Sequence, residues 1–419
     1  MNYCSEMKLE FFMASRLVRG VQKGGVASSV VRIAVVAVAL SVCVMIVSIS
    51  VIVGFRNEIM DKIIGFGSCV NIINRESAAN LESLPIDARQ DFYPSITEED
   101  GIRHIQRYAL KPCIFKSGSD IMGVMLKGVG EEYDWSFFGN NIVSGHTLDV
   151  QDTVSGNRIV ISKKMADLLN LEVGGSVVAY FIQDPPRMRK YTIVGIYATG
   201  LEDCDKLFAM VDINGIQKLN GWTDDQITGF EVMVDDIAEL DVMTEVVRGV
   251  AGYRIAEDGS MLRVSNVREN NRQLFDWITL TEMNVWVIIA IMVFVAFVNM
   301  STALLIIIFE KASMIGLMKA IGARNWQIRK VFILQSLYIL LKGLVIGNVI
   351  AFAIIALQHY TGIIALDAES YYVDHVPCAL NFWHFAIVDL GTLVLMTIMM
   401  TLPSLAIGLM QPAKVMGFK

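Results

Sequence analysis

Two ionisable residues lie inside long apolar runs of this sequence, where a charge is costly. Lys342 falls within the run 331–358, and Asp389 falls within the run 382–409. A lysine near the centre of a bilayer costs about 2.5 to 3.5 kcal/mol, so it needs a partner or a route to the interface. If the two runs cross a membrane in opposite directions, the two residues lie at similar depths. Two interpretations follow: an ion pair inside the membrane, or a lysine that extends to the interface and an aspartate that faces water near the outer rim.

Enzyme motifs are absent from the sequence. It contains no GxxxxGK[ST] phosphate loop, no HExxH zinc motif and no GxSxG nucleophile turn, and its 5 histidines are dispersed. The 6 cysteines form no CxxC pair and no cluster with histidine at metal-ligand spacing. The sequence allows one disulfide among Cys69, Cys113, Cys204 and Cys378 but indicates no pairing. We therefore predict no catalytic residue, no bound metal and no cofactor held by this chain.

The composition is that of a membrane protein. Hydrophobic residues make up 54% and charged residues 18% of the 419 residues, whereas the apolar share of a soluble domain is about 45 to 50%. The formal net charge is −7, and no basic stripe with interleaved aromatic residues occurs. These features argue against nucleic acid as a partner and leave membrane lipids as the expected surroundings.

Four apolar stretches are long enough to cross a membrane as helices. They are 29–53, 281–309, 331–358 and 382–409, and a hydrocarbon core about 30 Å thick needs about 20 residues. The first stretch is too long for the core of a signal peptide and no small-residue cleavage site follows it, so we expect an uncleaved anchor. The preceding residues 1–28 mix apolar and basic side chains, which is typical of a helix on the membrane surface.

Residues 54–280 have the composition of a folded α+β domain. Runs rich in β-branched and aromatic residues predict strands at 158–162, 176–182, 190–197, 207–211 and 229–234. The segment 183–189 joins two of these strands and contains paired prolines, so we expect a projecting hairpin tip. Residues 265–280 contain no helix breaker and run directly into the second span, which predicts a helical stalk.

The distribution of Lys and Arg predicts the orientation. The segments 1–28, 310–330 and 410–419 carry Lys and Arg, whereas 359–381 has none and includes Asp367, Glu369 and Asp374. Because cytoplasmic loops are enriched in Lys and Arg, we expect both termini in the cytoplasm and the large domain and the loop 359–381 outside.

The segment between the second and third spans is amphipathic. Its apolar residues fall at positions i, i+3, i+4 and i+7 of a helix and form one stripe, composed of Met314, Leu317, Met318 and Ile321. Gly322 stands where a helix-ending glycine belongs, and Asn325 can cap the following helix. We predict a short cytoplasmic helix and loop over 310–330. The helix either lies at the lipid interface or docks its stripe into a groove on a cytoplasmic partner.

A GxxxG pattern marks the third span. Gly343 and Gly347 lie one helical turn apart, and small residues at this spacing let another helix approach closely. The pattern predicts a helix–helix contact on this face.

Several stretches of the sequence resemble a known family. The residues of the amphipathic segment resemble the cytoplasmic coupling segment of FtsX-like (MacB-type) ABC transporter permeases, namely Glu310, Lys311, Ile315, Gly316, Leu317, Ala320, Ile321, Gly322, Ala323, Ile328, Phe332 and Gln335. Other stretches are similar to the lipoprotein-releasing (Lol) permease branch: SISVIVGFRNEIMDKIIGF, RIVISKKMADLLNLEVGGSV, YTIVGIYATGLEDCDKLFAMV, YYVDHVPCALN and PSLAIGLMQPAKVM. Together they cover nearly the whole chain.

The resemblance implies a four-span permease of the bacterial inner membrane with a MacB-like periplasmic domain. Its partners would be a second permease, identical or related, and a cytoplasmic ABC ATPase that binds the ATP. The ATPase would contact the coupling residues Glu310, Lys311, Met314, Ile315, Gly316, Leu317, Met318, Ile321, Gly322 and Ala323.

The family extracts lipoproteins from the membrane and hands them to a periplasmic carrier. Spans 1 and 2 would line the lipid cavity, with Val44, Ile52, Val287 and Ile291 as candidates chosen by depth. Relatives that recruit the carrier have a longer hairpin than 183–189, so the sequence leaves carrier binding by this subunit open.

Two alternative functions fit the same architecture. One is a MacB-like permease that transmits force to export substrates from the periplasm. The other is an FtsX-like regulator whose outer domain switches a periplasmic cell-wall hydrolase.

Overall fold

The computed structural model describes residues 26–79, 84–118, 120–150, 157–252, 259–367, 371 and 373–409. The chain divides into two compact units, a helical unit and a sheet unit. The sheet unit comprises Asn57–Trp277 and Ala365–His375, and the helical unit comprises the rest. The predicted tail 410–419, and the predicted surface helix up to residue 25, lie outside the described residues.

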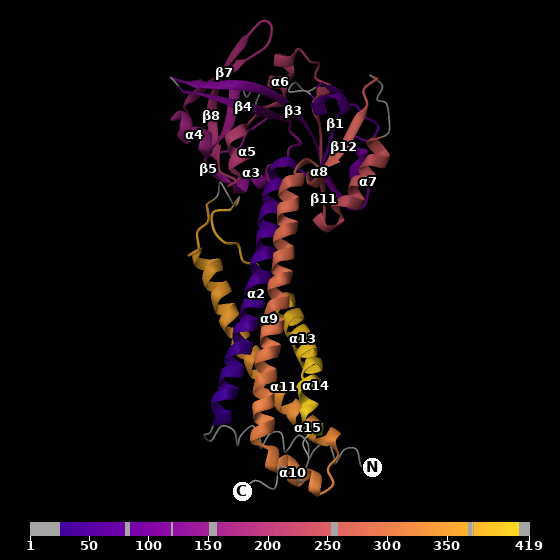
Figure 1. Ribbon diagram of the computed structural model, residues 1–419. Coiled ribbons are helices and arrows are strands. Elements are labelled where there is room, and N and C mark those ends of the chain that lie inside the picture. The colour runs from indigo at the N-terminus through magenta and orange to yellow at the C-terminus, as the bar shows by residue number, and fades with distance from the viewer. Residues whose placement is uncertain are drawn as a thin grey trace. The chain divides into compact units, whose positions relative to one another are not determined.

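Among the described residues, four helices are long and apolar enough to cross a membrane, which confirms the number of spans predicted (Figure 1). They are α2 (Val26–Gly67), α9 (Arg272–Glu310), α11 (Asn325–Thr361) and α13 (Phe382–Met399), the last followed by α14 (Thr401–Ser404) and α15 (Ala406–Leu409). Helix α2 continues past the predicted end of the first span, and α9 begins before the predicted start of the second. The helical stalk predicted over 265–280 is present from Arg272 onward, whereas 265–266 belong to strand β12 and 267–270 form the separate short helix α8. Helix α2 has a matching extension.

Proline explains the break in the last span. Helix α13 ends at Met399, and Pro403 lies four residues later in α14. A proline has no N–H, so Pro403 cannot donate to the carbonyl of Met399. The last span therefore ends in two short helical turns.

The GxxxG pattern packs α11 against α2. A Cβ atom built on Gly343 would lie 2.6 Å from Val38 Cγ1, and one on Gly347 would lie 2.7 Å from the carbonyl oxygen of Ala39. The predicted helix–helix contact is confirmed, and its partner is the first span. Around this contact the four spans bury a continuous apolar core that includes Val38, Met300, Leu340 and Met396.

The sheet unit is a mixed, ten-stranded sheet with short helices. Its strand order is β12-β1-β11-β3-β4-β9-β6-β8-β5, with β7 paired to β3 and β8, and β10 pairs with β2 separately. The strands are β1 (Val70–Asn74), β2 (Ile86–Asp87), β3 (Ile102–Ser117), β4 (Asp120–Val129), β5 (Ile142–Gly145), β6 (Arg158–Ser162), β7 (Ser176–Phe181), β8 (Arg187–Tyr197), β9 (Phe208–Asp212), β10 (Gln226–Ile227), β11 (Gly229–Val234) and β12 (Leu262–Asn266). The helices are α3 (Ser136–Asn140), α4 (Lys163–Leu169), α5 (Glu202–Leu207), α6 (Ile213–Asn220), α7 (Leu240–Ala251) and α8 (Val267–Asn270), and η1 (Arg75–Ala79), η2 (Ser95–Glu98) and η4 (Ile237–Glu239) are 3₁₀ turns.

All five predicted strands are present, as β6, β7, β8, β9 and β11. The predicted hairpin is present, because β7 and β8 pair antiparallel, but its tip is shorter than the predicted 183–189 because 187–189 already belong to β8. The fold class predicted from the sequence, four membrane helices with a mixed α+β domain, is thus confirmed. The cysteines Cys69, Cys113, Cys204 and Cys378 are all free, so none of them forms the disulfide that the sequence allowed.

Part of the predicted outer loop 359–381 belongs to the sheet unit. Ala365 and His375 form a β-bridge, and Leu366 N donates to Asp374 O at 2.9 Å. A Cβ on Gly200 would lie 2.7 Å from the ammonium of Lys62 and 3.8 Å from a carboxylate oxygen of Asp374. The β-bridge and the close packing around Gly200 therefore hold this part of the loop against the domain.

Candidate functional site

The amphipathic segment forms the predicted short helix. Helix α10 covers Ala312–Ala320. Gly322 has φ +99°, Gly322 N donates to Lys319 O at 3.0 Å, and Ala323 N donates to Met318 O at 2.9 Å. This pair of bonds is the Schellman ending in which a left-handed residue follows the helix, and glycine adopts that conformation at least cost. The predicted role of Gly322 is confirmed.

The cap of the next helix differs from the prediction. Helix α11 begins at Asn325, and its N-cap is Arg324, whose backbone N donates to Oε1 of Gln327 at 3.0 Å. A glutamine three residues into a helix can reach back to the cap residue in this way. The prediction of Asn325 as the cap is therefore wrong by one residue.

The predicted apolar stripe is divided between two faces of α10. Ile315 and Gly316 are buried, and Met314, Met318 and Ala323 pack partly buried against the helical core. Leu317 is 55% exposed and Ile321 is 78% exposed. Each residue turns an α-helix by about 100°, so Leu317 lies about 200° from Ile315 and faces away from the bundle. Leu317 and Ile321 are thus the residues that a partner can reach.

Two aromatic side chains at the adjoining helix ends are also exposed. Phe309 at the end of α9 is 63% exposed, and Trp326 at the start of α11 is 59% exposed. Glu310 and Lys311 join α9 to α10, with Lys311 Nζ 3.5 Å from Glu310 Oε1. We call Phe309, Leu317, Ile321 and Trp326 the coupling surface. These exposed apolar residues lie at the end of the helical unit that the sequence analysis expects in the cytoplasm.

A lysine on the inner face of α10 ties this helix to the last span. Lys319 Nζ donates to the carbonyl oxygen of Ile407 in α15 at 2.7 Å. Desolvation by burial lowers the pKa of Lys319, and the nearby charge of Arg329 lowers it further. A cation near the carbonyl end of a helix is favourable. This contact was not predicted from the sequence. The available signal was Lys319 itself, a basic residue in the last turn of α10.

The structure does not bring Lys342 and Asp389 together. Both oxygens of the Asp389 carboxylate accept from Nδ2 of Asn348 at 2.9 Å, and the ammonium of Lys342 lies 4.6 Å from the ring centroid of Tyr338. Asn348 follows Lys342 by six residues, so the two side chains lie about 120° apart around α11 and about 9 Å apart along it. The proposed ion pair is wrong: Asp389 pairs with an amide, and Lys342 makes a cation–π contact.

The four candidate cavity residues differ in exposure. Val287 is 57% exposed and Ile291 is 53% exposed on α9, where Trp286 and Phe294 are exposed as well. Val44 is partly buried, and Ile52 is only 8% exposed. Ile52 is therefore covered by other parts of this chain. The prediction used only its depth along the helix, and depth does not determine the face on which a residue lies. Val287 and Ile291 remain available to line a cavity with another subunit.

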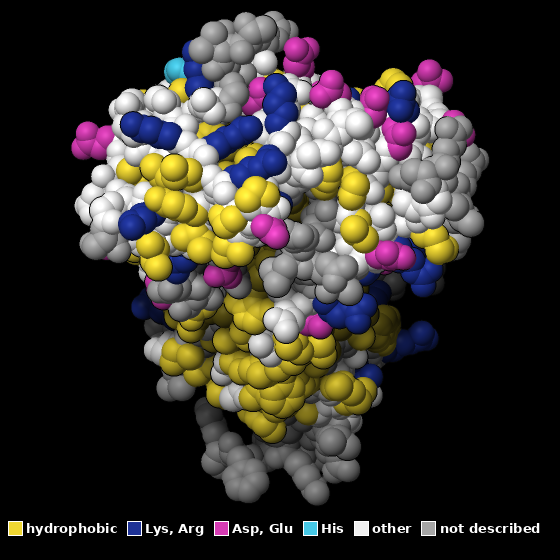
Figure 2. Space-filling view, turned by 90° about the horizontal axis from the view of Figure 1, so that it is seen from above, with side chains coloured by type: hydrophobic (Ala, Val, Ile, Leu, Met, Phe, Trp, Pro, Cys, Tyr) yellow, Lys and Arg dark blue, Asp and Glu magenta, His cyan; other side chains and the backbone are white. Residues whose placement is uncertain are grey.

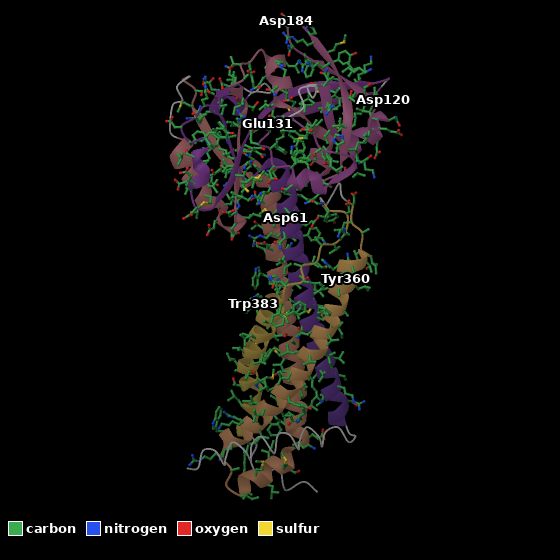
Figure 3. The ribbon with its side chains drawn as sticks, turned by 180° about the vertical axis from the view of Figure 1, so that it is seen from behind. Asp61, Asp120, Glu131, Asp184, Tyr360 and Trp383 are labelled. Atoms are coloured by element: carbon green, nitrogen blue, oxygen red, sulfur yellow. The ribbon has the colours of Figure 1, made fainter. Side chains whose placement is uncertain are left out.

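Aromatic residues mark one end of two spans. Tyr360 at the end of α11 is 81% exposed and Trp383 at the start of α13 is 71% exposed, and Figure 3 shows both at the same end of the helical unit. Tyr and Trp gather at membrane–water interfaces because one part of the ring system is apolar and another is polar. This end of the bundle therefore lies at an interface.

The β7–β8 hairpin presents an apolar and basic surface. Ile121, Ile182 and Met188 are 69%, 77% and 71% exposed, and Lys116 on β3 pairs with Ile121 in the ladder. Figure 1 shows the hairpin projecting from the sheet, and Figure 3 shows Asp184 at its tip. Seen from that end, hydrophobic side chains and Lys or Arg side chains lie side by side (Figure 2). We call Ile121, Ile182, Met188 and Lys116 the hairpin surface.

A metal centre has no support in the part of the chain that the structure describes, where no group of three or more His, Cys, Asp or Glu could hold an ion. The arrangement provides exposed apolar surfaces and connections between helices.

Two protein-family models match the chain. The model of the MacB-like periplasmic core domain matches residues 33–250, and the model of the FtsX-like permease C-terminal region matches residues 286–412. The first covers more than half of the chain. The second model covers the coupling surface and the spans formed by α9, α11 and α13, beginning inside α9 at residue 286.

Two named proteins are similar to this chain over nearly its whole length. The lipoprotein-releasing system transmembrane protein LolC of Neisseria meningitidis serogroup B is 22% identical over 433 residues, covering 98% of this chain and 99% of the relative. LolE of Haemophilus influenzae is 23% identical over 427 residues, covering 98% and 100%. Among solved structures, the periplasmic region of MacB from Actinobacillus actinomycetemcomitans is similar to 50% of this chain and 94% of its own, with 15% identity and a TM-score of 0.34.

Proposed function

The chain belongs to the MacB-like periplasmic core domain family, and from this premise we propose that it is the permease subunit of an ABC transporter that releases lipoproteins from the bacterial inner membrane. The observation that carries the proposal is the full-length similarity to LolC and LolE, which includes the helical unit and the sheet unit alike. Both termini would lie in the cytoplasm and the sheet unit in the periplasm, as the distribution of Lys and Arg predicts.

The physical task requires an external energy source. Each CH₂ group of an acyl chain contributes about 0.8 kcal/mol to membrane binding, so three acyl chains hold a lipoprotein by tens of kcal/mol. The chain contains no phosphate-loop motif, so the ATP would be bound by a separate cytoplasmic ATPase. Its binding site on this chain would be the coupling surface, where Leu317 and Ile321 are exposed.

Movement of the ATPase would reach more than one span. Helix α10 follows α9 directly, precedes α11, and is tied to α15 by the bond from Lys319 to Ile407. A displacement of α10 would therefore act on the second, third and fourth spans together.

The released lipid would enter an apolar cavity between two permeases. The exposed residues Trp286, Val287, Ile291 and Phe294 on α9 support this proposal, because an exposed apolar face at membrane depth contacts either lipid or another apolar surface. The second permease would be an identical copy or a related chain.

The hairpin surface would receive the periplasmic carrier. Its exposed Ile182 and Met188 offer apolar contacts at a projecting tip, and neighbouring Lys and Arg side chains favour an acidic partner. The tip is short, so the flat part of the surface around Ile121 would contribute much of the contact.

Depletion of the protein followed by membrane fractionation tests the function. The proposal predicts that outer-membrane lipoproteins accumulate in the inner-membrane fraction and that the wild-type gene, but not its Leu317→Asp variant, restores delivery. Normal delivery in depleted cells without any related permease would refute it. Normal delivery together with a defect in cell-wall hydrolysis or in export from the periplasm would instead favour one of the two alternative functions.

A further inference from the structure

A large cleft lies in the sheet unit, and the proposed function has not used it. Two adjoining cavities of about 520 Å³ and about 580 Å³ share the residues Phe66, Gly67, Asn71, Phe208 and Asn270. The two cavities adjoin at these five residues, and we refer to them together as the cleft. All of its lining residues belong to the sheet unit.

The cleft runs across the sheet. The first cavity takes one lining residue or more from each of the neighbouring strands β12, β1, β11, β3, β4 and β9, for example Arg263, Asn71, Glu231, Tyr108, Lys127 and Phe208. Neighbouring strands lie about 4.8 Å apart, so this path is about 24 Å long and would hold about seven residues of extended chain. This length exceeds what a metal ion or a single small anion requires.

A satisfied ion pair forms the floor of the cleft. Lys127 and Glu231 are buried and lie 2.6 Å apart, from Nζ to Oε1. Lys127 Nζ also donates to Phe66 O at 3.2 Å, and Gln106 Nε2 donates to Glu231 Oε2 at 2.8 Å. Because these charges already have partners, the floor would not hold a ligand by ion pairing.

The lining of the cleft is balanced in charge. It contains three acidic residues (Glu231, Glu269 and Asp203) and three basic residues (Lys127, Arg263 and Arg272). A site for a nucleotide or another anion would carry an excess of positive charge. An acyl chain is also a poor match, because it would leave these charges without water.

Carboxamides and aromatic rings provide the remaining contacts. Asn71, Asn270, Asn271 and Gln273 line the cleft. Nδ2 of Asn71 already donates to Gly67 O at 3.2 Å and Nδ2 of Asn271 to Val267 O at 3.0 Å, which holds these two side chains in place. A carboxamide has two N–H donors and an acceptor oxygen, so all four can still pair with a peptide group. Phe66 and Phe208 pack edge to face with their ring centroids 5.0 Å apart in the wall that both cavities share. This combination suits a main chain with small or uncharged side chains.

From this geometry we propose that the cleft binds an extended, uncharged segment of polypeptide, namely the stretch of the lipoprotein that adjoins its lipid anchor. The inference rests on the proposed function, which supplies a substrate with a polypeptide outside the membrane. The cleft would hold the polypeptide while the acyl chains leave the bilayer, so that release requires both parts of the substrate to be bound.

Site-specific photo-crosslinking in cells, with the full chain in its own complex, tests the inference. A benzoyl-phenylalanine replaces Asn270, which is exposed and lines both cavities. The matched control replaces Val242, which is 62% exposed on α7 and lines neither cavity. The probe is an epitope-tagged lipoprotein with a Ser/Asn/Gly-rich segment after its lipidated cysteine.

The expected result is an adduct at position 270 that mass spectrometry maps to the lipoprotein segment beside the lipid. The adduct at position 242 should be about tenfold weaker. The adduct at position 270 should also be about tenfold weaker when the lipoprotein segment is made all glutamate. An adduct at position 291 in the membrane but none at 270 would overturn the cleft and leave the proposed function intact. Equal adducts at 270 and 242 would also overturn it. No adduct at any position, together with normal lipoprotein delivery after depletion, would refute the proposed function itself.

A filling variant provides an independent measurement. Asn270→Trp places a large side chain in the shared part of the cleft and is expected to lower lipoprotein release about tenfold at unchanged ATP hydrolysis. Val242→Trp is the control, and the melting temperature of both variants reports folding. Normal release by a folded Asn270→Trp protein would contradict the inference.

Discussion

The contact between α11 and α2 makes a quantitative prediction about three glycines. A Cβ on Gly347 would lie 2.7 Å from the carbonyl oxygen of Ala39, well inside the 3.4 Å at which ordinary contact begins. A Cβ on Gly343 would meet the side chain of Val38 at 2.6 Å. On α13, Gly391 has no atom within 4 Å of its Cβ position. The three positions lie in membrane-spanning helices, so Gly→Ala has the same intrinsic effect on each helix.

The predicted order of destabilisation is Gly347→Ala, then Gly343→Ala, then Gly391→Ala. Overpacking a close contact costs about 1 to 3 kcal/mol, and we place Gly347→Ala at the upper end because a backbone oxygen cannot rotate away. Gly343→Ala should cost less because the nearest backbone atom, the carbonyl oxygen of Val35, lies at 3.3 Å, although Val38 Cβ at 2.8 Å cannot rotate away. Gly391→Ala is expected to be neutral or slightly stabilising, because alanine favours helix.

Equilibrium unfolding of the purified protein in mixed detergent micelles measures these differences. Each variant is compared with the wild type by its midpoint and slope. Equal effects of Gly347→Ala and Gly391→Ala would refute the packing argument, and so would a larger effect for Gly343→Ala than for Gly347→Ala.

Three further predictions concern a partly buried amide, a titrating carboxylate and the coupling surface. Asn348→Leu removes the amide that donates to Asp389 and is expected to lower the unfolding free energy by about 1 to 3 kcal/mol. Lys342→Leu should lower it less. Equal losses would contradict the assignment of Asn348, and not Lys342, as the partner of Asp389. Burial opposes ionisation of Glu132, but its bonds with Arg107 outweigh burial and hold the pKa of Glu132 below its usual 4.5. The ionised form thus stabilises the sheet unit above pH 4.5, and this contribution is lost as the pH falls through the lowered pKa. Glu132→Gln should flatten the acid limb of a thermal melting profile, whereas Glu131→Gln, at the exposed neighbouring position (Figure 3), should leave it unchanged. Leu317→Asp places a charge on the exposed face of α10 and should abolish stimulation of the ATPase by this permease, measured as phosphate release. Ser313→Asp is the control, because Ser313 is exposed but has no apolar side chain. It should change the stimulation little.

The sequence predicted the parts of the fold that have local signals. The four apolar spans, the strands from β6 to β9 and β11, and the glycine after α10 each have a periodicity or a residue type that fixes them. Strand β3 escaped prediction because it is long, contains Pro112, and carries polar residues such as Gln106 that are satisfied only by distant partners. Local pattern cannot reveal such partners.

The candidate site shows the same limit. The sequence located α10 and its apolar residues, but which of them face outward depends on contacts with the other spans. The pairing of Asp389 with Asn348 depends on the rotation of α11 about its axis, and the bond from Lys319 to Ile407 joins residues far apart in the chain. Depth along a helix can be counted from sequence, whereas rotation about the helix axis is set by tertiary packing.

Release of a lipoprotein from a reconstituted membrane tests the central proposal most directly. The purified complex of this chain with its ATPase is placed in liposomes that carry a radiolabelled triacylated lipoprotein, and ATP is added with a soluble acceptor outside. The account predicts ATP-dependent transfer of the label to the soluble fraction, and no transfer by the Leu317→Asp complex. Retention of the label in the membrane by a wild-type complex that hydrolyses ATP would contradict it.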